Sequence, residues 1–188
     1  GDDNYWVDSS DDTIVENEGE GTDRVFSSVD YTLSSNVEKL VLTGDQSIDG
    51  AGNDQDNSVQ GNSNDNVLNG RSGNDILRGN GGSDTFVFDS PLDEQKNCDF
   101  ISDFVSGQDK LLLNRSIFSA LPGDGDLTSC FASSATGVPV DENDFLLYNT
   151  STGGLFYDSD GNGQGAAVEF VTLHGKPDIK VSDFIVVS

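Results

Sequence analysis

The fold is decided by residues 52–87, GNDQDNSVQ GNSNDNVLN GRSGNDILR GNGGSDTFV, which divide into four blocks of nine residues. Every block begins with glycine, at positions 52, 61, 70 and 79. The sixth position of each block carries a side-chain oxygen, in the order Asn57, Asn66, Asp75, Asp84. The eighth position is apolar, in the order Val59, Leu68, Leu77, Phe86. Three columns in register over four blocks indicate a repeat architecture, in which each unit packs against its neighbours.

Each block combines a turn with a short strand. Its first six residues are rich in Gly, Asn and Asp, which tolerate the positive φ angles of tight turns. The last three residues form a strand whose middle side chain points inward, so one large apolar residue recurs in every block. Two blocks then complete one coil, and the turns of every second block stack on the same side.

This pattern resembles the calcium-binding nonapeptides of the repeats-in-toxin (RTX) family, with the consensus G-G-x-G-x-D-x-U-x. The resemblance implies an all-β fold, a parallel β-roll (a β-helix-like solenoid), with several Ca²⁺ ions held between stacked turns. It pairs Asn57 with Asp75 across one site and Asn66 with Asp84 across another. It also implies backbone oxygen ligands around Gly70, Ser72, Gly79 and Gly81. The first two blocks depart from the consensus, because Asn replaces Asp at position six and Gln55 and Asn64 replace Gly at position four; their turns are expected to bind more weakly.

Residues 1–51 carry a shorter version of the same pattern. It occurs once as Gly1-Asp3-Tyr5 and again as Gly21-Asp23-Val25, and the separation of the two copies is close to that of stacked turns. We expect degenerate, stretched coils here, with a further calcium site between Asp3 and Asp23. The chain opens in the middle of this pattern, which favours a piece of a longer polypeptide.

Residues 89–188 lose the nonapeptide period and are expected to form a β-rich capping and secretion-signal region. The segment from Asp99 to Leu111 resembles the one that closes the roll of serralysin-type proteases, which makes Asp99 and Asp103 candidate ligands of a last calcium; a plain strand with solvated acids is the alternative. A short helix is expected over residues 115–121, ending before Pro122. Residues 145–148, 155–157, 168–173 and 179–187 are predicted to be antiparallel strands that cap the open end of the roll. The C-terminal residues 183–188, an acid followed by apolar residues, resemble the uncleaved export signal of type I secretion substrates.

Two further features leave alternatives open. Asp158-Ser159-Asp160-Gly161-Asn162-Gly163, with Glu169 following, fits an EF-hand loop, but its strand-like flanks favour a hairpin turn instead, either stabilised by calcium or merely Gly-rich. Cys98 and Cys130 belong to no metal-spacing motif, and the sequence fits a disulfide and two free thiols equally well.

The charge balance excludes several partners. The 34 acidic and 9 basic residues give a formal net charge of −25, which argues against nucleic acid and anionic membranes as partners. No apolar run reaches the roughly 20 residues that span a bilayer. Repulsion of this size opposes compaction unless cations bind, so disorder is the alternative for the ion-free chain.

The sequence therefore predicts a calcium-binding module that folds outside the cell and supports type I secretion and stability of a larger exported protein. Its expected partners are calcium, the type I secretion apparatus and the rest of the parent polypeptide. We expect no catalytic activity in this chain, because His174 is the single histidine and lies in a predicted turn. The alternatives are a polysaccharide- or surface-binding module, like the repeat modules of secreted alginate epimerases, with Arg71 and Arg78 as sugar contacts, or the tail of a protease, lipase or adhesin. A secreted, extracellular or cell-surface location is expected in each case.

Overall fold

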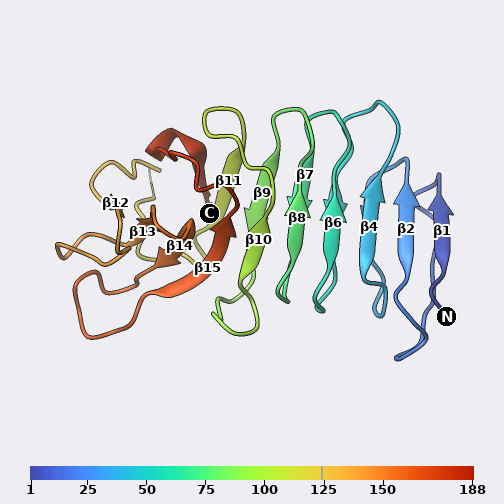
Figure 1. The fold of residues 1–188 in the computed structure, drawn as a ribbon, viewed down its shortest axis with the longest axis horizontal. Coiled ribbons are helices and arrows are strands. Elements are labelled where there is room, and N and C mark those ends of the chain that lie inside the picture. The colour runs from blue at the N-terminus through green and yellow to red at the C-terminus, as the bar shows by residue number, and fades with distance from the viewer. Residues whose placement is uncertain (124) are drawn as a thin grey trace.

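The chain forms an elongated roll in which two sheets face each other along most of its length (Figure 1). The structure is a computed structural model that describes residues 1–123 and 125–188. Sheet A has ten strands in the order β1-β2-β4-β6-β8-β10-β15-β14-β13-β12, and sheet B has six in the order β16-β11-β9-β7-β5-β3. The all-β fold class and the parallel roll are thus confirmed.

The strands are short, as the repeat predicts. Those of sheet A are β1 (Asn4–Val7), β2 (Arg24–Ser27), β4 (Lys39–Leu42), β6 (Ser58–Gln60), β8 (Ile76–Arg78), β10 (Asp99–Ile101), β15 (Val168–Leu173), β14 (Gly154–Tyr157), β13 (Leu146–Asn149) and β12 (Phe131–Ser134). Those of sheet B are β16 (Phe184–Val187), β11 (Lys110–Asn114), β9 (Thr85–Phe88), β7 (Val67–Asn69), β5 (Gly50–Ala51) and β3 (Tyr31–Thr32). A single turn of 3₁₀ helix, η1 (Val181–Asp183), precedes β16.

Successive nonapeptides alternate between the two sheets. Strand β6 pairs in parallel with β8 in the register Ser58 to Ile76, and β7 pairs with β9 in the register Val67 to Thr85. Both registers advance by two nonapeptides, so two blocks make one coil. The turns of alternate blocks therefore stack directly on each other.

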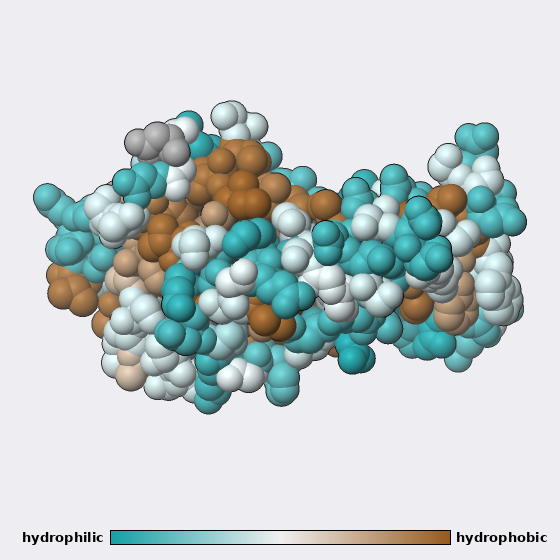
Figure 2. Space-filling view, turned by 90° about the horizontal axis from the view of Figure 1, so that it is seen from above, coloured by the Kyte–Doolittle hydropathy of each residue, from teal (hydrophilic) through white to brown (hydrophobic). Residues whose placement is uncertain are grey.

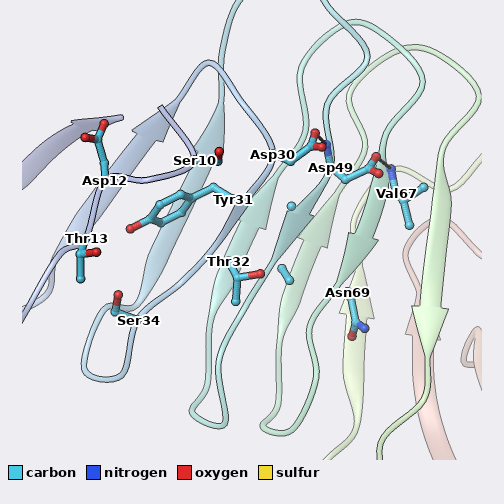
Figure 3. Close-up of a pocket in the computed structure, with 12 residues that line it drawn as sticks. Ser10, Asp12, Thr13, Asp30, Tyr31, Thr32, Ser34, Asp49, Val67 and Asn69 are labelled. Carbon is cyan, nitrogen blue, oxygen red and sulfur yellow. Dashed lines mark hydrogen bonds between the residues drawn. The ribbon is translucent and has the colours of Figure 1, made fainter. Parts of the chain in front are cut away.

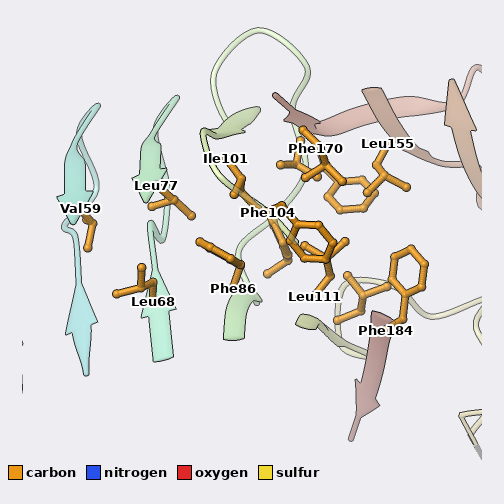
Figure 4. Close-up of a cluster of buried hydrophobic side chains, with 14 of the residues drawn as sticks. Val59, Leu68, Leu77, Phe86, Ile101, Phe104, Leu111, Leu155, Phe170 and Phe184 are labelled. Carbon is orange, nitrogen blue, oxygen red and sulfur yellow. The ribbon is translucent and has the colours of Figure 1, made fainter. Parts of the chain in front are cut away.

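The apolar column fills the space between the sheets. All four residues at position eight, from Val59 to Phe86, are 0% exposed. They continue into buried side chains of the C-terminal half such as Leu155 and Phe170 (Figure 4). The centroid of the Phe170 ring lies 5.2 Å from that of Phe88 and 5.1 Å from that of Phe118, and both contacts are edge-on. One apolar core thus runs through the roll into its cap.

The N-terminal coils are irregular, as expected. Strands β1 and β2 both belong to sheet A, and residues 8–23 connect them without a strand in sheet B. Asn4 pairs with Arg24, and Arg24 pairs with Lys39, so the first coil is longer than two nonapeptides and the second is shorter. Ile14 is buried and anchors the connecting loop on the core.

The C-terminal half corrects two predictions. Strand β16 was expected to be antiparallel, but it pairs in parallel with β11 and extends sheet B. The pairing is parallel because the chain enters β16 from the same edge of sheet B from which it enters β11. Strand β15 likewise joins β10 in parallel and is antiparallel only to β14; β13 pairs antiparallel with β14, while β12 pairs in parallel with β13. The helix expected over residues 115–121 is a series of turns, since a segment this short gains little as a helix and instead buries Phe118 and Leu121 in the core.

Hydrophilic residues dominate the surface of the roll, whereas hydrophobic residues gather on the C-terminal part of the face in Figure 2. Within the described residues, no helix has the length and apolar character needed to cross a bilayer.

Candidate metal-binding turns

The turns of the roll form two rows, one along each edge of the stacked sheets. We call the turns that lead from sheet B into sheet A (residues 52–57, 70–75 and 89–98) the first turn row. The turns that lead from sheet A into sheet B (residues 61–66, 79–84 and 102–109) are the second turn row. Position six of each repeat ends its turn and faces the neighbouring turn of the same row.

Side chains and backbone link the first turn row into a ladder. The backbone N–H of Asn57 donates to Oδ1 of Asp75 at 2.7 Å, and the N–H of Asp75 donates to Oδ1 of Asp99 at 3.1 Å. All three residues are buried, with exposed fractions of 5% or less. The structure therefore brings Asn57 and Asp75 together as the repeat predicts, and it adds Asp99 as the next step.

The second turn row repeats the arrangement with a residue that the sequence reasoning missed. The N–H of Asn66 donates to Oδ1 of Asp84 at 2.9 Å, and the N–H of Asp84 donates to Oδ1 of Asp109 at 3.0 Å. Asp109 is 3% exposed. Its signal was present in Gly107-x-Asp109-x-Leu111, the same short G-x-D-x-U pattern that marks the N-terminal coils.

Asp103 contacts the turn of residues 79–84 through its carboxylate, and its predicted role as a calcium ligand stays a prediction. Its two carboxylate oxygens accept the N–H groups of Gly79 at 3.0 Å and Asn80 at 2.8 Å, and Oδ2 lies 3.6 Å from Nε of Arg78. It therefore braces the beginning of turn 79–84, while Asp109 holds the buried ladder position. The ligand roles predicted for the backbone oxygens around Gly70, Ser72, Gly79 and Gly81 stay predictions.

The ladder leaves carboxylate oxygens that lack partners. Among the described residues, the buried side-chain atoms without a hydrogen bond are Oδ2 of Asp75 and Oδ2 of Asp23. A Cβ atom at Gly70 would lie 2.2 Å from Asp75 Oδ2, and one at Gly79 would lie 2.1 Å from Asp84 Oδ2. Glycine at position one thus makes room for the Asp carboxylate of its own turn, which fills the space that a Cβ would occupy. An oxygen-only donor set with an unpaired buried carboxylate suits a hard cation such as Ca²⁺.

Burial also makes the ionised ladder costly. It raises the pKa of Asp75 to about 8, with a further contribution from the charge of Asp99, and it raises the pKa of Asp99 itself to about 7. In the second turn row, burial raises the pKa of Asp84 to about 6 and also raises the pKa of Asp109. Positive charge between the stacked carboxylates would lower these pKa values and favour the ionised forms.

The asparagines end both ladders on their N-terminal side. Nδ2 of Asn57 donates to the carbonyl oxygen of Val37 at 3.2 Å, and Nδ2 of Asn66 donates to that of Ile48 at 2.6 Å. Nδ2 of Asn53 donates to the Val37 carbonyl as well, at 2.8 Å. Toward the preceding coil these turns thus offer amide donors instead of carboxylate oxygens. The substitution of Asn for Asp therefore marks where the carboxylate ladder begins.

Hydrogen bonds of the same kind link the coils at the N-terminal end of sheet A. The N–H of Asp3 donates to Oδ1 of Asp23 at 2.8 Å, and the N–H of Asp23 donates to Oε2 of Glu38 at 2.8 Å. Asp3 and Asp23 are thus neighbours, as their spacing predicts. Glu38 was missed, because a glutamate at the end of a coil shorter than two nonapeptides matches no repeat consensus.

The EF-hand-like turn is the connection of a β-hairpin, as its flanks predicted. Residues 158–167 join the antiparallel strands β14 and β15. Oε1 of Glu169 accepts the hydroxyl of Thr172 at 2.9 Å and lies over Gly154. The turn folds on itself, since the N–H of Asp160 donates to Oδ1 of Asp158 at 3.1 Å. Glu169 thus contacts Thr172 and Gly154 instead of facing the turn, as the last ligand of an EF-hand loop would.

Cys98 and Cys130 are free thiols.

A groove of about 470 Å³ lies beside β3, β5 and β7 of sheet B, next to residues 10–13 of the N-terminal loop (Figure 3). Hydroxyl groups line it, together with Asp12, Asp30 and Asp49. Two of these acids are structural, because Oδ1 of Asp30 accepts the N–H of Asp49 at 2.9 Å and Oδ1 of Asp49 accepts the N–H of Val67 at 2.9 Å. Carboxylates in this position would repel an acidic sugar.

The two arginines suggested for an acidic sugar lie apart from this groove. Arg71 lines a small hollow with Phe88 and Phe170, whereas Arg78 forms the ion pair with Asp103. A role of Arg71 and Arg78 as sugar contacts stays a prediction.

Comparison with known proteins assigns the family. No curated protein matches the sequence. The family described as Peptidase M10 serralysin C terminal matches residues 6–186, which includes every nonapeptide, both turn rows and the C-terminal cap. RTX repeats of this family are calcium binders, and the β-roll is its fold. The chain belongs to the serralysin C-terminal family of RTX-repeat domains.

Proposed function

We propose that this chain is a calcium-dependent folding module that supports the type I secretion and the stability of a larger exported protein. The observation that carries the proposal is the buried, unpaired Oδ2 of Asp75 in a row of stacked acids. A net charge of −25 adds long-range repulsion to this local cost. Folding is then unfavourable where calcium is scarce and favourable outside the cell.

In this proposal the carboxylates bind the ions, and the glycines and apolar residues shape the turns and strands around them. Asp75, Asp84, Asp99 and Asp109 present carboxylate oxygens between adjacent turns, while Gly70 and Gly79 leave room for the carboxylates of Asp75 and Asp84. Bound Ca²⁺ would supply the positive charge that these turns lack. Val59, Leu68, Leu77 and Phe86 then hold the strands in register beneath the turns.

The gain from such binding matches the stability of a domain. The ladders contain four adjacent turn pairs: Asn57–Asp75, Asp75–Asp99, Asn66–Asp84 and Asp84–Asp109. A site with a dissociation constant of about 10⁻⁴ M contributes about 1.4 kcal/mol at roughly millimolar calcium. Four such sites contribute about 5–6 kcal/mol, similar to the total stability of a small domain.

A circular-dichroism titration tests the folding part of this proposal. The full chain in chelator should show little β signal and a large hydrodynamic radius, and millimolar Ca²⁺ should convert it to the compact β form. Magnesium at the same concentration should convert it poorly, because Mg²⁺ demands a stricter octahedral geometry and dehydrates reluctantly. An equal β signal in chelator and in calcium would refute the proposal.

The export part needs a separate test. A cargo protein fused to the N-terminal side of this chain should reach the medium only in cells that carry a type I exporter. The same cargo without the chain should stay inside. Export of the cargo in the absence of the exporter would contradict this role. In this proposal, any catalytic activity belongs to other parts of the parent protein.

The groove beside sheet B favours one second candidate, the binding of a neutral polysaccharide. Its hydroxyl-bearing residues suit an uncharged sugar better than alginate, given the three carboxylates nearby. Calorimetry in calcium against neutral and acidic polysaccharides separates the possibilities. Heat on binding with the neutral sugar alone would support this candidate.

A further inference from the structure

A cluster of three carboxylates lies at the N-terminal end of the roll, outside the nonapeptides. One oxygen atom of each of Asp3, Glu16 and Asp23 lies within 4.8 Å of the others. Asp3 and Asp23 directly precede the strands β1 and β2 of sheet A, while Glu16 comes from the loop of residues 8–23. Three separate segments of the chain thus converge on one point at the end of the roll (Figure 1).

The cluster contains a buried oxygen that lacks a partner. Asp23 is 1% exposed, and among the described residues its Oδ2 is one of the buried side-chain atoms without a hydrogen bond. Its other oxygen accepts the N–H of Asp3 at 2.8 Å, and this hydrogen bond holds the carboxylate with its free oxygen inside the protein. This is the same arrangement as at Asp75 in the nonapeptides.

The surrounding contacts hold Glu16 toward this oxygen. Nδ2 of Asn36 donates to the carbonyl oxygen of Glu16 at 3.0 Å, and the hydroxyl of Tyr5 donates to Oε1 of Glu16. Within the described part of the chain, no Lys or Arg forms an ion pair with any of the three carboxylates, and the ion pair of Asp3 is with the Gly1 nitrogen, at 3.5 Å. Three carboxylates held this close without an ion pair to Lys or Arg repel one another, and an ion between them would remove that repulsion.

We propose that Asp3, Glu16 and Asp23 form a calcium site that ties the loop of residues 8–23 to strands β1 and β2. The all-oxygen donor set is that of a hard cation, and the loop origin of Glu16 supplies the flexibility that Ca²⁺ tolerates better than Mg²⁺. The site compensates for the coil that has no strand in sheet B, because it fixes the loop where backbone pairing is missing. It deepens the proposed calcium-dependent folding by adding a site that uses no nonapeptide.

Luminescence of Tb³⁺, a calcium substitute, tests this site in the full chain. Trp6 is the single tryptophan and lies on β1, about 10 Å along the strand from Asp3, whereas Asp75 lies four strands away, at about 19 Å. Energy transfer falls with the sixth power of distance. Emission excited through Trp6 therefore reports the N-terminal site in preference to the nonapeptide sites.

Glu16→Gln should weaken the Tb³⁺ binding reported through Trp6 by about tenfold or more, because affinity follows the charge count of the ligands. Glu18→Gln is the matched control, since Glu18 is an exposed glutamate of the same loop, and its binding should equal that of the unaltered chain. Asp3→Asn should act like Glu16→Gln. If Glu16→Gln and Asp3→Asn both bind Tb³⁺ as tightly as Glu18→Gln, the site is refuted.

A calcium titration by circular dichroism keeps this result separate from the proposed function. Glu16→Gln should still gain most of its β signal from calcium through the two turn rows. Failure of the N-terminal site alone would leave the calcium-induced folding of the unaltered chain intact. Failure of the proposed function would remove the calcium response of the unaltered chain itself.

Discussion

Asp75 is the residue at which the effects of calcium and of buried charge can be separated. It belongs to two turn pairs at once, since its carboxylate accepts the N–H of Asn57 and its own N–H donates to Asp99. Asp75→Asn keeps the size of the side chain and an acceptor oxygen but removes the charge. We expect the substitution to destabilise the calcium-loaded protein and to stabilise the ion-free form.

The two effects have different origins. In calcium, both sites that share Asp75 are weakened, and at about 1.4 kcal/mol for each site the loss is on the order of 3 kcal/mol. That corresponds to a fall in Tm of about 6–12 °C for a domain of this length. In chelator, the substitution removes the buried carboxylate of Asp75, which lies beside Asp99. Burial raises the pKa of Asp75 to about 8. After allowance for solvent screening, this gain is on the order of 1–2 kcal/mol.

Two measurements test the predicted loss of stability in calcium and the predicted gain in chelator. Thermal unfolding in millimolar calcium measures the loss. In chelator, the concentration of trimethylamine N-oxide needed to fold the chain measures the gain, because this osmolyte favours compact states, and Asp75→Asn should need less of it. Asp54→Asn is the matched control, since Asp54 is an exposed acid in the same turn row. A change of the same sign in both conditions, or equal effects of the two substitutions, would refute the reasoning.

Three more predictions follow from the turns and the core. Asn57→Asp should extend the first turn row by one calcium site toward Val37 and increase the Tb³⁺ bound at saturation, whereas an unchanged stoichiometry would show that the amide is not what ends the ladder. In chelator, the β signal should be larger at about pH 5 than at about pH 8. Folded-state pKa values of about 8 for Asp75 and 6 for Asp84 lie above the unfolded value of about 3.9. The two carboxyl groups therefore stabilise the fold fully below about pH 4, and this stabilisation is lost as the pH rises through about 6 to 8. A β signal that grows with pH would contradict this prediction, and saturating calcium should abolish the pH dependence. Leu77→Ala, at a position that is 0% exposed, should cost about 2–5 kcal/mol in chemical denaturation with calcium present, and a cost below about 1 kcal/mol would show that the column is not closely packed.

The repeat made the centre of the molecule predictable from sequence. Glycine at position one and an apolar residue at position eight define the turn and the inward face of each strand, and the two-block coil then defines the register. The resemblance to the RTX repeat implied the pairing of Asn57 with Asp75 and of Asn66 with Asp84, and the structure confirms that these residues are adjacent. Their role as metal ligands stays a prediction.

Other parts of the site depend on contacts that no period encodes. Glu16 reaches Asp3 and Asp23 because Ile14 anchors its loop, and nothing in the sequence pattern specifies that approach. The coil from Asp84 to Asp109 is longer than two nonapeptides, so the count of the repeat does not extend to Asp109. The parallel pairing of β16 depends on where the chain lies after β15, which strand-like patterns alone do not specify.

The ladder has a direction, because each carboxylate accepts a hydrogen bond from the coil that precedes it in sequence. A roll shortened from its N-terminal side keeps every acceptor that its remaining nonapeptides require. A roll shortened just before Asp99 leaves the N–H of Asp75 without its acceptor, and one shortened before Asp109 does the same to Asp84. Truncations of equal length should thus be tolerated at the N-terminal end of the roll and should destabilise it at the C-terminal end. The turns depend on the cap, because its side of the roll provides the last hydrogen-bond acceptors of both ladders.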